Sequence, residues 1–291
     1  MRINRFLAAA GLGSRRGVEE LITTGRVKIN GRVVTDLGTQ VGEEDSVKVG
    51  SRVVRPQQHI YAVLNKPCGY LCTADDERGR RTIFDLLPSN WPQVSYVGRL
   101  DKESEGLLLI TNDGDLSLKL THPRYKIEKE YEVTIDRPFD PAHREKLLHG
   151  IHIEGGLAKA EAVNTRGPKA LRLILRQGIK RQIRLMLYSL GYEVVHLFRT
   201  RIGSIKVDVQ SGEWRLLTAK EVELLREEPP AKVETVRRKP AAPRTRTPRA
   251  DNPTGPRARK VPGRTARPPA SGATPRKARP PARSSRGPRP E

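Results

Sequence analysis

The sequence predicts an α+β protein made of two folded parts and a basic C-terminal tail. Residues 1–55 combine two short helical patterns with a few short strands, whereas residues 59–228 are dominated by strands joined by irregular loops. Because strands and helices do not alternate regularly in the second part, its sheet should be mixed or mostly antiparallel. The roughly 228 residues before the tail are enough for one medium domain and one small domain.

The first part should begin with two helices. In residues 2–10 apolar side chains recur at helical spacing, and Gly11 and Gly13 follow as stop signals. Ser14 is expected to cap a second helix that ends at Gly25. The apolar face of that helix is formed by Val18, Leu21 and Ile22.

A small sheet should follow these helices. Val27 and Ile29 alternate with polar residues up to Asn30-Gly31, which is the strongest short-range signal for a β-hairpin. A further strand is expected at 46–50, and the polar residues 55–59 should form a connector. The sequence therefore predicts a compact module of helix, helix and sheet.

Two arginines of this module stand out by their position. Arg15 and Arg16 should occupy the first turn of the second helix, where cations oppose the helix dipole. An unfavourable local choice of this kind suggests a phosphate contact, and the alternative is a pair of solvated arginines on a surface helix. The neighbouring glycines do not have the spacing of a dinucleotide-binding loop, and no strand precedes them.

The segment RINRFLAAAGLGSRRGVEELITTGRVKINGRVV resembles the S4-type RNA-binding domain over residues 1 to about 50. The resemblance implies that the module binds structured RNA through basic residues of its helices, Arg15 and Arg16 among them. Since S4-type domains accompany several kinds of RNA enzyme, this likeness indicates the class of partner and not the reaction.

From Ile60 onward the pattern is mainly that of strands. The best helix of this part spans 178–191 and ends at Gly191. A charged loop, DDERGRR, interrupts the first strands. The sequence predicts strands at 60–67, 70–73, 82–88, 106–110, 131–135, 171–176 and 193–207.

The tail differs from the rest of the chain in composition. The whole protein carries a net charge of +22, and residues 229–291 alone contain 18 basic and 3 acidic residues together with 15 of the 23 prolines. This segment has no aromatic residue, so it cannot bury enough apolar surface to offset the entropy of ordering. We expect it to be disordered and to add nonspecific RNA affinity; the alternative is a solubilising extension.

Other sequence features suggest a cytoplasmic protein. No run approaches the ~18 apolar residues of a membrane span, and the N-terminus lacks the apolar stretch of a signal peptide. The two cysteines, Cys68 and Cys72, are too few for a disulfide framework and form a poor zinc signal. A monomer without a metal site is expected.

The segment GRLDKESEGLLLITNDG, residues 98–114, places an acid within a basic stretch. A carboxylate near RNA phosphates is repelled, so Asp101 requires an explanation. Three are open: an ion pair with Arg99 or Lys102, a helix cap, or chemistry on a base or sugar. A cap is the weakest, because 106–110 is a strand-like apolar run.

Two further segments bear on this choice. The predicted helix 178–191 carries Lys180, Arg184 and Tyr188 along the border of its apolar face, where an arginine could reach inward to a carboxylate. Tyr131, at the start of a strand, could stack on an extruded base. The simpler alternatives are a solvated helix face and a core tyrosine.

GRLDKESEGLLLITNDG, together with LNKPCGYLCT, HPRYKIEKEYEV and KRQIRLM, resembles the RsuA/RluB/RluE/RluF family of ribosomal RNA pseudouridine synthases. The resemblance implies isomerisation of uridine to pseudouridine without a metal or organic cofactor. It also implies that Asp101 is the essential carboxylate, that Tyr131 lies against the target base, that Arg184 pairs with Asp101, and that Arg99 helps displace the target nucleotide. It assigns no role to Lys180 and Arg181.

The resemblance is greatest to the enzymes that act on the large ribosomal subunit. It therefore implies 23S ribosomal RNA, or a large-subunit assembly intermediate, as the partner. Two alternatives remain: an enzyme for 16S ribosomal RNA, and a ribosome-assembly protein that binds RNA without turnover.

Overall fold

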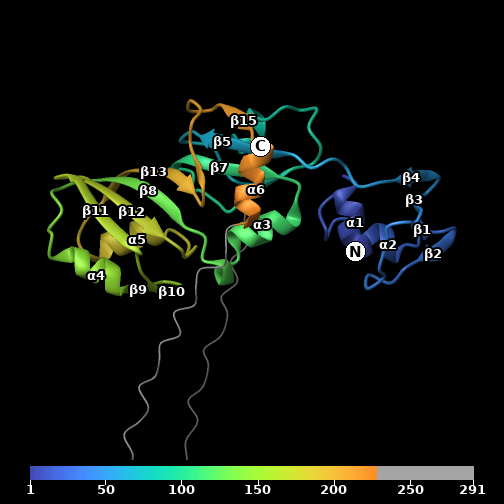
Figure 1. The fold of residues 1–291 in the computed structure, drawn as a ribbon, viewed down its shortest axis with the longest axis horizontal. Helices are drawn as coiled ribbons and strands as arrows, with labels where there is room; N and C mark the ends of the chain where they lie inside the picture. Colours follow the sequence, from blue (N-terminus) through green and yellow to red (C-terminus); the bar gives the residue numbers. More distant parts are fainter. Residues whose placement is uncertain (228–291) are drawn as a thin grey trace, which may run out of the picture. The chain divides into compact units, whose positions relative to one another are not determined.

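The computed structural model describes residues 1–227. The predicted tail, 229–291, lies outside the described residues. Figure 1 shows the helices and strands of the described part. None of its helices is both long enough and apolar enough to cross a bilayer.

The N-terminal module has two helices and a four-stranded antiparallel sheet. The helices are α1 (Ile3–Ala9) and α2 (Glu19–Thr23), and the strands, in the order β2-β1-β3-β4, are β1 (Val27–Ile29), β2 (Arg32–Val34), β3 (Val47–Val49) and β4 (Arg52–Val54). Asn30 and Gly31 have φ values of 50° and 83°, which confirms the predicted hairpin. The strand β4 was not predicted.

The start of α2 differs from the prediction. The hydroxyl of Ser14 accepts a hydrogen bond from the Gly17 amide at 3.0 Å, so it closes a turn and does not cap α2, which begins five residues later at Glu19. Arg15 and Arg16 are exposed in this turn. The expectation that they oppose the dipole of α2 in its first turn is therefore wrong, since Glu19 and Glu20 occupy that turn.

The second part is built on a nine-stranded sheet with the main order β11-β12-β8-β13-β7-β5-β15, to which β6 and β14 add. All pairs are antiparallel except β13 with β7, which confirms the predicted mixed, mostly antiparallel sheet. Its strands are β5 (Tyr61–Lys66), β6 (Ser95–Val97), β7 (Glu105–Thr111), β8 (Lys129–Ile135), β11 (Ala162–Gly167), β12 (Ala170–Leu175), β13 (Val194–Ile202), β14 (Ile205–Lys206) and β15 (Trp214–Leu216). A separate hairpin joins β9 (Ile151–Ile153) to β10 (Gly156–Ala158).

Helices cover both faces of this sheet. In Figure 1, α3 (Gly114–Thr121) and α6 (Ala219–Glu227) lie side by side, and they enclose one apolar core with Leu107 and Leu109 of β7. On the opposite face, α4 (His143–His149) and α5 (Gln182–Ser189) pack on a second core that contains Leu108 and Ile110. Both faces of β7 are thus buried, which explains its unbroken apolar run.

Several local predictions were wrong. Residues 70–73 form only a bridge between Leu71 and Thr82 and not a strand. The apolar run 82–88 forms a 3-10 helix, η1 (Ile83–Leu86), because Thr82 and Asp85 cap each other's backbone. A second 3-10 helix, η2 (Pro123–Tyr125), was not predicted.

One predicted helix starts late and another helix was not predicted. The helix α5 begins four residues later than predicted because Arg181 has a left-handed backbone, with a φ of 54°. The unpredicted helix is α3, which Asp113 caps, since its carboxylate accepts hydrogen bonds from the amides of Asp115 and Leu116 at 3.0 and 3.1 Å.

Candidate active site

The centre of the large sheet contains a fork at β7. One edge of β7 pairs with β5 along its length, from Thr111 to Gly106. The other edge is divided: residues 109–111 pair with β6, whereas residues 105 and 106 pair with β13. The segment 98–104, which joins β6 to β7 and carries Asp101, leaves the sheet at this fork.

Arg199 of β13 fills the gap between the two partners of β7. Its Nε donates to the Leu107 carbonyl at 2.7 Å, and its Nη1 donates to the Arg99 carbonyl at 3.3 Å. The side chain is almost fully buried. A single guanidinium therefore joins β7 to the segment that carries Asp101.

Gly106 allows β13 to approach β7 this closely. It has a φ of 101°, and a Cβ at this position would lie 2.4 Å from the Arg199 carbonyl oxygen. Only glycine fits both the backbone conformation and the contact. The fork thus depends on one residue of the GLLLI segment.

Lys66, at the end of β5, fixes the path of the Asp101 segment. Its Nζ is fully buried and donates to the carbonyls of Ser104 (2.7 Å), Pro67 (3.0 Å) and Lys102 (3.4 Å). Burial lowers the pKa of Lys66, and nearby negative groups, Asp101 included, oppose that shift. The segment is therefore held by its main-chain oxygens and not by its acid.

The local ion pair considered for Asp101 does not form. Within residues 1–227, no arginine or lysine nitrogen lies within 4.0 Å of its carboxylate. The half-buried side chain instead lines a cleft of about 430 Å³.

This cleft brings together three of the residues predicted from the sequence: Arg99, Asp101 and Tyr131. Among the described residues that line it, Asp101 is the single carboxylate. Five cationic side chains surround it, namely Arg99, Lys129, Lys180, Arg181 and Arg199. The cleft is therefore strongly cationic with one acid inside.

The rest of the wall is largely apolar. Tyr131 is 9% exposed, and it lies on the face of β8 that also carries Val133 and Ile135. Leu100, Leu175, Ile179, Ile183 and Leu197 complete this apolar part of the lining. A planar base could lie against these side chains while Asp101 remains within reach.

Arg184 does not take the place that was predicted for it. Its Nη1 donates to the Val194 carbonyl at 2.9 Å and its Nη2 to the Glu103 carbonyl at 3.2 Å, so it makes no bond to Asp101 and does not line the cleft. Because α5 starts late, Arg184 lies in its first turn and faces the start of β13. It ties α5 to the Asp101 segment through the backbone of that segment.

The late start of α5 also changes the predicted stripe of Lys180, Arg184 and Tyr188. Lys180 and Arg181 precede the helix and line the cleft, and Arg181 forms a 3.4 Å ion pair with Glu103 at its rim. Tyr188 is exposed.

Sequence reasoning missed three cations of this region: the buried Lys66 and Arg199 and the half-buried Lys129. For Lys129 one signal was present, because it stands two residues before Tyr131 and so shares its face of the strand. Burial and then the neighbouring Arg199 lower the pKa of Lys129 to about 8. Ser104 also lines the cleft, and its buried Oγ has no hydrogen-bond partner in the described chain.

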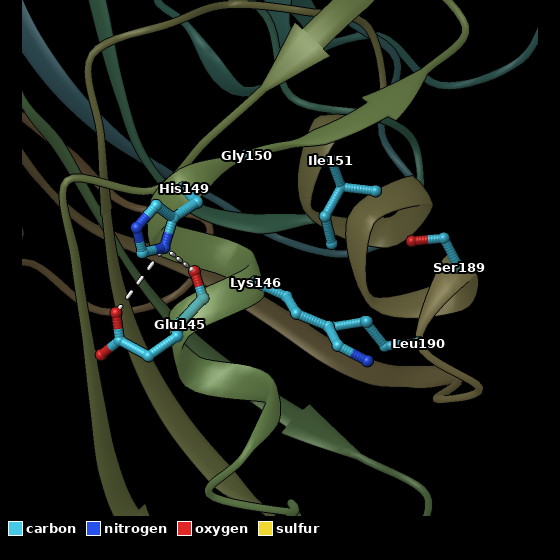
Figure 2. A pocket seen from close by; sticks show the side chains of 7 residues that line it. All are labelled: Glu145, Lys146, His149, Gly150, Ile151, Ser189 and Leu190. Carbon is cyan, nitrogen blue, oxygen red and sulfur yellow. Dashed lines mark hydrogen bonds and ion pairs between the residues drawn. The ribbon is translucent and has the colours of Figure 1, made fainter.

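A second hollow, of about 460 Å³, lies between α4 and α5. Figure 2 shows its lining: Glu145, Lys146, His149, Gly150, Ile151, Ser189 and Leu190, with His149 bonded to the carbonyl of Glu145. Its lining contains no Phe, Tyr or Trp and none of the predicted site residues. The Asp101 cleft is therefore the candidate active site, suited to nucleophilic or base chemistry on part of a polyanion.

Comparisons with known proteins identify the family of both parts of the chain. Residues 60–189 match the family model for RNA pseudouridylate synthase, and residues 1–47 match that of the S4 domain. An uncharacterized RNA pseudouridine synthase of Aquifex aeolicus is 41% identical over 229 residues, which cover 76% of this chain and 92% of the relative.

Two relatives with assigned activities are similarly close. The ribosomal large subunit pseudouridine synthase B of Bacillus subtilis is 38% identical, covering 77% of this chain and 95% of that protein. The dual-specificity RNA pseudouridine synthase RluF of Escherichia coli is 37% identical, covering 76% of this chain and 77% of that protein.

A solved structure shares the fold. The crystal structure of a pseudouridylate synthase matches with a TM-score of 0.58 and 30% identity, covering 77% of this chain and 99% of that one. The chain therefore belongs to the RsuA-type family of ribosomal RNA pseudouridine synthases, and it is an enzyme that isomerises uridine in RNA.

Proposed function

We propose that this enzyme converts a uridine of 23S ribosomal RNA to pseudouridine, with Asp101 as its essential carboxylate. The observation that carries the proposal is the single acid in a cleft with five cations. Cations attract the phosphates that flank a target nucleotide, whereas an acid beside phosphates is unfavourable unless it takes part in the chemistry.

The other predicted residues fit the same proposal. Tyr131 lies where an extruded uracil could rest against it, and eversion of a base costs a few kcal/mol that such contacts repay in part. Arg99 is exposed on the segment that carries Asp101, so it could enter the space left by the target nucleotide. Arg15 and Arg16 are exposed in the N-terminal module, in keeping with a phosphate contact.

The choice of 23S RNA rests on relatives. The Bacillus subtilis protein is named for the large ribosomal subunit, and it matches this chain over nearly its full length. The Escherichia coli relative is named a dual-specificity RNA pseudouridine synthase, so relatives alone do not fix the RNA of this enzyme. A large-subunit assembly intermediate is the second form in which 23S RNA could be the substrate.

The proposal is tested by incubating the full chain with unmodified 23S and 16S transcripts and mapping pseudouridine by carbodiimide-dependent primer stops. We expect a new stop in 23S RNA that disappears with Asp101→Asn. The matched control is Asp75→Asn, which removes an exposed carboxylate outside the cleft lining and should leave the stop unchanged.

Other outcomes would redirect or reject the proposal. A stop in 16S RNA alone would assign the small subunit, and a stop only in 23S RNA within an isolated assembly intermediate would assign that particle. Full activity of Asp101→Asn would reject the catalytic assignment. RNA binding without any stop in either transcript would reject the naked ribosomal RNAs as substrates.

A further inference from the structure

The buried Arg199 and the half-buried Lys129 form a group of cleft cations to which the proposed function assigns no role. Arg199 and Lys129 both line the cleft beside Tyr131. Tyr131 and Arg199 are paired in register on neighbouring strands, and Lys129 follows on the same face of β8 two residues away. The three side chains thus form one continuous wall.

Arg199 still has capacity to bind. Its Nε and Nη1 donate to backbone carbonyls, but its Nη2 is buried without a hydrogen-bond partner among residues 1–227. A buried donor left unpaired is destabilising, so an acceptor is expected to complete it.

Lys129 is similarly incomplete. In the described chain the only hydrogen bond of its Nζ goes to the Ile127 carbonyl, at 3.2 Å, and no carboxylate lies within 4.0 Å of that nitrogen. Burial, and then repulsion by the neighbouring Arg199, lower the pKa of Lys129 to about 8. Two like charges held together without an anion indicate that the anion arrives with the substrate.

The reaction supplies such an anion. When the N1–C1′ bond of uridine breaks, its electron pair stays on the uracil and spreads over N1, O2 and O4. C5 then bonds to C1′ and loses its proton, N1 gains one, and the isomerisation is balanced without a co-reactant. If Asp101 first adds to C6 of the ring, electron density moves to O4, so each route places negative charge on a uracil carbonyl oxygen.

We propose that Arg199 and Lys129 stabilise this negative charge. The Nη2 of Arg199 donates to one uracil carbonyl oxygen, and the ammonium of Lys129 lies beside the ring. Both would then be catalytic residues that stabilise the anionic base between bond breaking and bond formation. The inference rests on the proposed function, because it requires the Asp101 cleft to hold the target uracil.

The test uses the full chain and 23S and 16S transcripts labelled with tritium at C5 of uridine, since isomerisation releases that hydrogen. We expect Lys129→Met to lower the single-turnover rate at saturating enzyme by about 10–100-fold and to change the RNA Kd by less than about 2-fold, because donors to a developing charge act on the transition state. The matched control is Lys169→Met, which removes an exposed lysine at the far end of β8.

Arg199→Lys keeps the charge but removes Nη2, and we expect it to lower the rate further. Because Arg199 also joins Leu107 to Arg99, that loss alone would not separate chemistry from misplacement of the Asp101 segment. The pH profile tests the Lys129 part of the inference instead. The wild-type rate should fall as the pH rises through about 8, whereas the rate of Lys129→Met should stay low without that fall.

Other charged or titratable groups face Lys129 from the elements around it. They are Tyr131 on β8, Arg199 on β13, Arg99 and Asp101 on the segment before β7, and Lys180 and Arg181 before α5. Loss of the alkaline limb in Lys129→Met assigns that limb to Lys129 and not to these neighbours.

A wild-type rate for Lys129→Met, or a loss confined to Kd, would overturn the inference. Asp101→Asn in the same assay separates the two proposals. If Asp101→Asn is inactive and Lys129→Met is normal, only this inference fails; if Asp101→Asn keeps its activity, the proposed function fails.

Discussion

The two faces of strands β12, β8 and β13 differ in whether their cationic side chains form ion pairs. On one face Arg172 pairs with Glu130 at 2.6 Å, and Arg201 pairs with both Glu130 (3.2 Å) and Glu128 (3.1 Å). On the cleft face, Lys129 and Arg199 have no carboxylate within 4.0 Å among residues 1–227.

The difference shows that this sheet pairs its arginines with carboxylates on the face where a stable fold is the only requirement. Hydrogen bonds from Arg172, and then Arg201, lower the pKa of Glu130 below its ordinary value. On the cleft face Lys129 and Arg199 lack such partners, and the register shift between Arg199 and Arg201 puts these two arginines on different faces of β13. We infer that the cations of the cleft face are left without carboxylate partners because they bind a negatively charged substrate.

The largest expected effect follows from removing the one acid of the cationic face. Asp101→Asn should lower the rate of pseudouridine formation by at least about 10³-fold, because the amide is neither a nucleophile nor a base. The rate is measured by tritium release, and RNA Kd should change little. A variant that loses affinity in proportion to its rate would make Asp101 a binding residue.

The next largest effect concerns Gly106, at the fork where β13 pairs with β7. Gly106→Ala should lower the free energy of unfolding by roughly 2–4 kcal/mol, since its Cβ would meet the backbone of Arg199 in a conformation that alanine avoids. Urea unfolding followed by circular dichroism measures this change. Gly114→Ala is the control: open space surrounds it at the start of α3, so stability should stay equal or rise slightly.

On the paired face, Arg172→Met should destabilise the protein by roughly 1–2 kcal/mol, because it leaves the nearly buried Glu130 with Arg201 alone. The isomerisation rate should not change. The same urea titration and tritium-release assay check both statements. A fall in rate with unchanged stability would mean that the ion pairs serve the reaction and that the contrast between the faces is false.

The smallest effect has the opposite sign. The pKa of Lys129 falls from 10.5 to about 8 in the folded chain, so between these pH values the unfolded chain holds the proton more tightly and stability rises with pH. Lys129→Met should therefore be more stable than wild type at pH 7, on the order of 1 kcal/mol, and this advantage should shrink toward pH 10.5. Urea titrations at both pH values measure it, and an advantage that does not depend on pH would come from packing alone.

Local signals explain which parts of the fold could be predicted. The strand β7 follows from an apolar run that only a doubly buried strand accommodates, and the first hairpin follows from Asn30-Gly31. The apolar residues of η1 were mistaken for a strand because the reciprocal cap of Thr82 and Asp85 was overlooked.

The candidate site was predictable only in part. Arg99, Asp101 and Tyr131 were identified through a family resemblance, and the structure brings them into one cleft. The roles of Lys66 and Arg199 depend on the order of strands in the sheet, which no local pattern specifies. Arg184 was misplaced because the left-handed backbone of Arg181, which delays α5, has no sequence signal at an arginine.

The hydrogen bonds from Lys66 to main-chain oxygens of the Asp101 segment have an evolutionary consequence. Lys102 and Glu103 are exposed, and Lys66 holds Lys102 and Ser104 only through their carbonyls, so the route of the backbone past Asp101 is indifferent to the side chains on its outer side. Substitutions at the rim can accumulate without disturbing the reacting group. An ancestral enzyme could in this way change the RNA it recognises while its chemistry stays the same.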